Sequence, residues 1–79
     1  MLLEGKVKRV ALLTAVDICL RKKKNSPKRC ARNIIELGLT AYPGKLTAAE
    51  QNILFENILA AFDQGDIAEV RTLFSAAFL

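Results

Sequence analysis

Four stretches of the sequence are almost free of residues that interrupt helices, and the residues between them are ones that begin or end helices. Prolines occur only at positions 27 and 43, and the four glycines stand at 5, 38, 44 and 65, with Gly5 near the start of the first stretch. Within each stretch, apolar residues recur three or four positions apart, the spacing that places them on one helical face. The sequence therefore predicts an all-α fold: a small orthogonal or antiparallel bundle of about four helices, over residues 3–23, 27–37, 48–64 and 67–78.

Three of these helices begin with recognisable capping residues. Ser26 precedes Pro27, which suits the first helical position because its missing N–H has no partner there in any case. Thr47 and Glu50 have the spacing of a capping box, in which each side chain binds the other residue's backbone N–H. Asp66 is expected to cap the last helix.

Two glycines are expected to end helices. Gly38 and Gly65 follow apolar stripes, and glycine adopts the left-handed conformation after a helix at little cost. Leu39 is then expected to fold back onto Ile34. The short joint at Gly65 predicts a tight corner between the third and fourth helices.

The first predicted helix is apolar on nearly all sides, so it is expected to be the central and most buried one. Its apolar residues project in three directions, namely Val7, Ala11 and Ile18, then Leu12, Val16 and Cys19, then Leu13 and Leu20. Asp17 is the exception. Its expected partner is Arg21, four residues on, just as Lys8 is expected to pair with Glu4.

The length and composition describe one small domain, residues 1–79, with little equipment for catalysis. The chain has 79 residues, of which 52% are apolar, and it has no histidine. Histidine is the commonest general base and metal ligand. No glycine-rich phosphate loop or nucleophile elbow is present. We therefore expect no enzyme, no catalytic residue, no metal site and no cofactor.

Two cysteines are too few for a disulfide framework or a closed zinc site. Free thiols indicate a reducing compartment, so a cytoplasmic location is expected. If the first two helices form an antiparallel hairpin, however, Cys19 and Cys30 lie level across it. A bridge between them is then geometrically feasible.

The longest apolar stretch, residues 10–20, is too short to span a membrane and contains Asp17. Lysines and an arginine precede this stretch, as in a signal peptide. Basic residues also follow it, where a cleavage site would need small residues. We therefore expect neither a membrane span nor a signal peptide.

Charge is divided unequally along the chain. Residues 1–33 hold ten basic and two acidic side chains, and residues 34–79 hold two basic and six acidic ones. The densest cluster comprises Arg21, Lys22, Lys23, Lys24, Lys28, Arg29 and Arg32. It is interpreted either as a solvated cap that keeps the protein soluble or as a contact surface for DNA or RNA phosphates. An acidic protein or an anionic membrane surface is a further alternative.

The surplus apolar surface of the first predicted helix favours binding to another protein chain. Three short helices cannot easily cover a helix that is apolar all round, and obligate interfaces resemble a core cut in half. The sequence therefore predicts a small interaction or regulatory module that binds another protein, most simply as a homodimer. The expected interface residues are Leu12, Val16, Leu20, Phe78 and Leu79.

Overall fold

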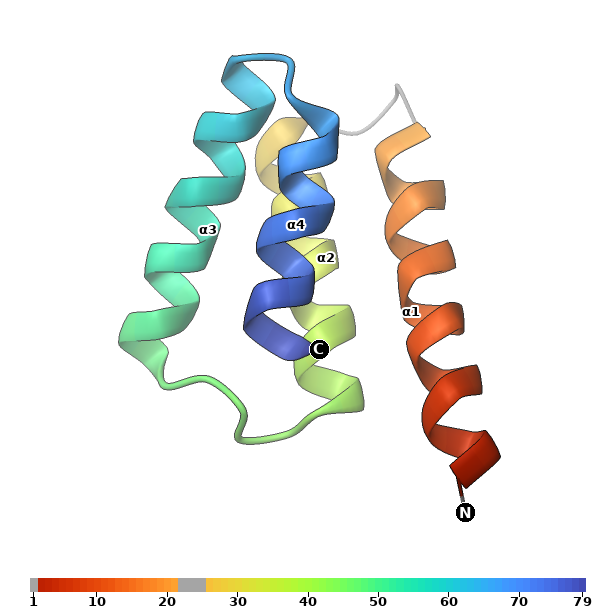
Figure 1. Ribbon diagram of the computed structural model, residues 1–79. Coiled ribbons are helices and arrows are strands. Elements are labelled where there is room, and N and C mark those ends of the chain that lie inside the picture. Colours follow the sequence, from red (N-terminus) through yellow and green to blue (C-terminus); the bar gives the residue numbers. More distant parts are fainter. Residues whose placement is uncertain (1, 22–25) are drawn as a thin grey trace.

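The computed structural model describes residues 2–21 and 26–79, with side chains from Lys8 onward in the first range, and these residues form four helices and no strand. The helices are α1 (Leu2–Arg21), α2 (Pro27–Ala41), α3 (Ala48–Asp63) and α4 (Ile67–Phe78) (Figure 1). The predicted all-α, four-helix fold is confirmed. The expected end of the first helix at residue 23 lies outside the described residues.

The predicted helix starts are confirmed in atomic detail. The side-chain oxygens of Ser26 and Asp66 each accept the backbone N–H three residues further on, at 3.3 and 3.1 Å. In the capping box, Thr47 Oγ1 accepts the Glu50 N–H at 3.1 Å, and Glu50 Oε1 accepts the Thr47 N–H at 2.9 Å. Because these hydrogen bonds favour the ionised carboxylate, they lower the pKa of Glu50 below its usual 4.5.

The two glycines expected to end helices behave differently. Gly65 follows α3 with a φ of +70°, the left-handed conformation that was predicted. The prediction for Gly38 is wrong, because α2 continues through it to Ala41. Gly38 is buried, and a side chain there would occupy the space filled by the Phe78 ring of α4. This glycine therefore permits close packing between two helices, and Leu39 remains helical and does not fold back.

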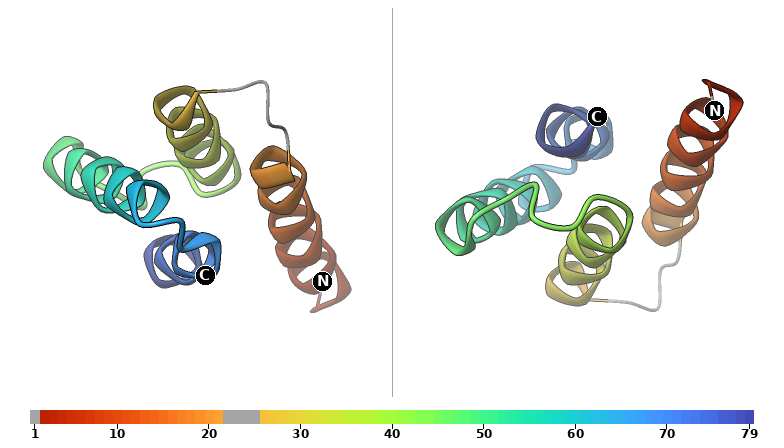
Figure 2. Two further views of the ribbon diagram at one scale, coloured as in Figure 1. Left: turned by 90° about the horizontal axis from the view of Figure 1, so that it is seen from above. Right: turned by 90° about the horizontal axis from the view of Figure 1, so that it is seen from below.

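The helices form a diamond with α2 and α4 as its central pair. Each of these two contacts all three other helices, whereas α1 and α3 lie on opposite sides and make no contact with each other through the residues that the structure describes. Figure 2 shows this arrangement along the bundle axis. The prediction that the first helix is central is therefore wrong. Because α1 is apolar on all sides, its sequence does not specify which face packs against the other helices. In the structure α4, and not α1, lies where it contacts all three other helices.

The core lies between the four helices and draws on each of them. Among the described residues of α1, only three side chains are buried, and the other helices supply the rest. The buried apolar residues are Leu12, Val16, Cys19, Cys30, Ala31, Ile34, Ile35, Leu54, Ile58, Ala61, Val70, Phe74 and Phe78. Because α1 contributes so little, most of its surface faces outward.

Gly38→Ala is expected to destabilise the protein although alanine is the better helix former. The added methyl overlaps the Phe78 ring. Overpacking of this kind costs about 1–3 kcal/mol, and the gain in helix propensity is at most about 1 kcal/mol. Urea unfolding should therefore show a net loss of stability.

Two further variants isolate the cause of that loss. Thr40→Ala, at an exposed position of the same helix, should leave stability unchanged or slightly raised. Phe78→Leu removes the ring, so in that background Gly38→Ala should cost less. A Gly38→Ala protein as stable as the original chain would contradict the packing described here.

Candidate functional site

Between Arg9 and Arg21, α1 has one charged side chain, Asp17, which is partly exposed and pairs with Arg71 of α4 beside the outward face. Val10 is 63% exposed and Ile18 50% exposed, and Thr14 lies midway between them. Positions four apart lie on one side of a helix. We call Val10, Ala11, Thr14, Ala15 and Ile18 the α1 stripe. Four large apolar side chains of the described residues are exposed, and the α1 stripe holds two of them, so it is the main unpartnered apolar surface.

A groove between α1 and α2 continues this surface toward the core. Its volume is about 510 Å³, within the range of ordinary ligand and side-chain pockets. Its lining is mainly apolar, with three polar residues from α2: Leu12, Ala15, Ile18, Cys19, Leu37 and Ala41, then Asn33, Glu36 and Thr40. Ile18 belongs to both the groove and the α1 stripe, so the two form one continuous surface.

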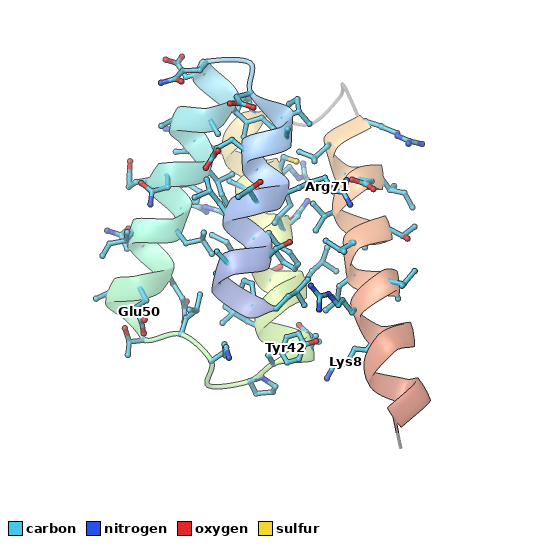
Figure 3. The ribbon with its side chains drawn as sticks, in the orientation of Figure 1. Lys8, Tyr42, Glu50 and Arg71 are labelled. Carbon is cyan, nitrogen blue, oxygen red and sulfur yellow. The ribbon has the colours of Figure 1, made fainter. Side chains whose placement is uncertain are left out.

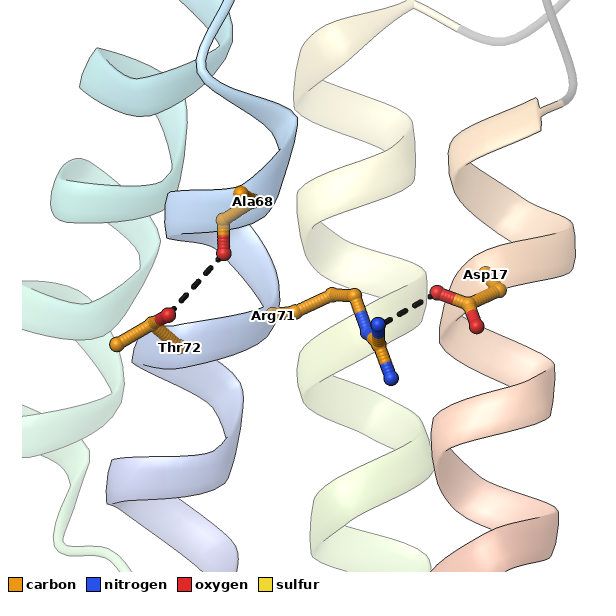
Figure 4. A network of polar contacts seen from close by, with 4 residues as sticks. All are labelled: Asp17, Ala68, Arg71 and Thr72. Carbon is orange, nitrogen blue, oxygen red and sulfur yellow. Dashed lines mark hydrogen bonds and ion pairs between the residues drawn. The ribbon is translucent and has the colours of Figure 1, made fainter.

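On its other side, α1 is joined to α4 by an ion pair. Arg71 Nε lies 3.1 Å from Asp17 Oδ1 (Figure 4). The expected pairing of Asp17 with Arg21 is therefore wrong, because α4 brings a cation from a distant part of the sequence. A second hollow beside this pair, lined by Leu13 and small residues of α4, leaves α1 loosely covered here as well.

The residues predicted to form an interface lie mostly inside the subunit. Leu12, Val16 and Phe78 are 8%, 0% and 2% exposed. Leu20 and Leu79 are half-buried and pack against the same core. The first three are corrected from interface to core residues, because α2 and α4 already cover the inner side of α1. Sequence reasoning missed Val10 and Thr14, although their spacing from Ile18 was available as a signal.

The basic cluster is only partly described, because Lys22, Lys23 and Lys24 lie outside the described residues. Arg21, Lys28, Arg29 and Arg32 are exposed. Lys28 lines a hollow together with Glu56 and Asp63 of α3. Arg32 lies over the Phe55 ring, 5.7 Å from its centroid. Two of the four described cations therefore lie beside α3, and two acids of α3 line the same hollow as Lys28.

Lys8 also has a partner that the sequence did not reveal. Its Nζ lies 4.5 Å from the centroid of the Tyr42 ring, which follows the end of α2 (Figure 3). The expected partner, Glu4, has a side chain outside the described residues. This cation–π contact holds the N-terminal half of α1 near the α2–α3 loop.

Cys19 and Cys30 face each other across the first two helices. Their Sγ atoms are 2.9 Å apart, and both residues are buried and carry free thiols. Burial, with a further contribution from the hydrogen bond to Cys19, raises the pKa of the Cys30 thiol from 9.0 to about 12. The level placement expected from the sequence is confirmed, and no bridge is formed.

Among the residues that the structure describes, no group of three or more side chains is suited to hold a metal ion. None of the described helices combines the length and apolarity required to cross a membrane. Comparisons with protein-family models, curated proteins and solved structures gave no match for this chain.

A double-mutant cycle should detect the ion pair between Asp17 and Arg71. Both side chains are partly exposed, so Asp17→Asn and Arg71→Gln should show a coupling energy of about 0.5 kcal/mol in urea unfolding. The coupling should fall in concentrated salt, which screens exposed charges. The matched cycle of Asp17→Asn with Arg21→Gln should show none, and the reverse ranking would support the sequence-based pairing.

Alkaline pH should destabilise the reduced protein through Cys30. The folded state holds this proton up to a pKa of about 12, whereas the unfolded thiol releases it near 9.0. Its contribution to stability is therefore complete below pH 9 and is lost as pH rises toward 12. Between pH 8 and 10.5, wild type should lose about 1–2 kcal/mol more than Cys30→Ala in anaerobic urea unfolding. Parallel pH curves would contradict this expectation.

Proposed function

We propose that this protein is a non-enzymatic interaction module that binds an amphipathic helical segment of another protein on the α1 stripe and the adjoining groove. The observation that carries the proposal is the exposed α1 stripe, bordered by Asp17 on its α4 side, on a helix at the edge of the bundle. Helical segments commonly bind in this way, with apolar side chains spaced along one face inserted into a groove.

The dimensions of the surface support such an occupant. Val10 and Ile18 are eight residues apart, which is about 12 Å along a helix axis, or roughly two turns of a bound helix. Burying the exposed parts of these side chains contributes about 1 kcal/mol each. The groove beside Ile18 adds a concave site for an apolar side chain from the partner.

Charge at one end of the stripe favours a partner with acidic residues. Arg21 lies on the same side of α1 as Val10 and Thr14, because eleven and seven residues are close to whole numbers of helical turns. Arg21 is exposed and has no acidic partner among the described residues. Two parallel copies joined through the stripe bring Arg21 of one copy near Arg21 of the other. Because like charges at an interface are costly, this arginine supports an acid-flanked helix over a parallel homodimer.

The nucleic-acid alternative has weaker support. Phosphate binding needs cations that are free to contact the backbone. Lys28, however, shares its hollow with Glu56 and Asp63, whose negative charge repels phosphate. Binding to duplex DNA or structured RNA, weakening steeply with salt, remains the prediction of that alternative.

A designed peptide tests the proposal directly. The probe is a helical 18-residue peptide with leucines along one face and glutamates at both ends, and its counterpart carries lysines at the ends. Fluorescence anisotropy at low salt should show at least about ten-fold tighter binding of the glutamate peptide. Ile18→Glu should weaken this binding by a similar factor, because it removes apolar contact and adds a repelling charge.

Ile53→Glu is the matched control, since Ile53 of α3 is 60% exposed and lies away from the stripe. It should leave peptide binding unchanged. Equal binding of both peptides, or equal effects of Ile18→Glu and Ile53→Glu, would reject the α1 stripe as the site. Light scattering at micromolar concentration should show a monomer, and a dimer abolished by Ile18→Glu would replace this proposal with the homodimer.

A further inference from the structure

The two buried thiols lie where a covalent link would join the edge helix to the central pair. Cys19 is in the last turns of α1 and Cys30 in the first turns of α2, eleven positions later. Each sulfur also points toward the other residue's backbone carbonyl, at 3.8 and 3.5 Å. The two side chains are therefore directed toward each other from both helices.

We propose that Cys19 and Cys30 are a site of reversible intramolecular disulfide formation that staples α1 to α2. The sulfurs need to approach by only about 0.9 Å to reach bonding distance. This inference is independent of the proposed binding function.

The oxidant is a small-molecule disulfide such as oxidised glutathione. One protein thiolate attacks it, which forms a mixed disulfide and releases one small thiol. The second protein thiolate then attacks the protein sulfur of that mixed disulfide and releases the second small thiol. Two protein thiols are thereby oxidised by two electrons, and one small disulfide is reduced to two thiols.

The effect of the bond follows from how weakly α1 is otherwise attached. Among its described side chains, three are buried, and its described ion pair, to Arg71, is partly exposed. A disulfide that closes a loop of this length restricts the unfolded chain and so favours the folded one. The bond thus stabilises the attachment of the helix that carries the α1 stripe.

Burial also makes the reaction slow. The thiolate is the attacking species, and both cysteines are buried, with Cys19 at the lining of the groove between α1 and α2. The thiol–disulfide equilibrium must therefore be approached both from the reduced and from the oxidised protein, so that a slow reaction of the buried thiols does not determine the measured ratio.

The test compares the thiol–disulfide equilibrium of the full chain when folded and when unfolded in urea. Reduced protein is incubated with oxidised glutathione, and protein oxidised in urea and refolded is incubated with reduced glutathione. After acid quenching and alkylation in denaturant, intact mass gives the fraction bridged. The folded chain should favour the bridge on the order of 100-fold more than the unfolded chain. The oxidised protein should melt higher, by on the order of 10 °C.

Cys19→Ala and Cys30→Ala each retain one thiol and should show neither the unalkylated bridged species nor the rise in melting temperature. The wild-type product should be a monomer that dithiothreitol returns to the dithiol form. An equal or lower preference for the bridge in the folded chain would overturn the proposal. A product dominated by glutathione adducts or by linked dimers would also overturn it.

Discussion

The contact between the Phe78 ring and the bare backbone at Gly38 joins the two helices that each touch all the others in this small bundle. Because Gly38 has no side chain, α4 approaches α2 closely enough to bury the ring to 2% exposure. Phe78 in turn packs against Phe74, with ring centroids 5.1 Å apart. The two helices therefore form the central pair, and α1 and α3 occupy the sides that remain.

The edge position of α1 follows from that pairing and explains its surface. Among the described side chains of α1, those facing α2 and α4 are covered, and they attach the helix through a few buried residues, an ion pair to Arg71 and the Lys8–Tyr42 contact. The opposite side keeps Val10 and Ile18 in solvent. An apolar helix at the edge of a bundle differs physically from one at its centre, because its surplus surface is available to another molecule.

The distribution of charge along the sequence differs from its distribution in the folded protein. The first 33 residues are strongly basic and the remainder acidic, which along the sequence looks like two separate halves. Folding places the start of α2 beside α3, so Lys28 lines the same hollow as Glu56 and Asp63. Asp17 of the basic half likewise pairs with Arg71 of the acidic half. The apparent separation of charge is thus reduced in the folded protein, whereas Arg9 and Arg21 at the ends of the α1 stripe remain exposed.

The sequence by itself determined the number of helices and where three of them begin, because caps such as Ser26 and the Thr47–Glu50 pair act within three residues of the chain. It also predicted that Cys19 and Cys30 lie opposite each other, because in an antiparallel pair of helices their distances from the connecting turn determine which residues face each other. The tertiary structure alone decided which helix is central, why Gly38 is a glycine, which cation Asp17 meets and which face of α1 is left open. Each of these depends on residues far apart in the chain. A helix that is apolar on every side contains no local signal for the face that its neighbours will cover.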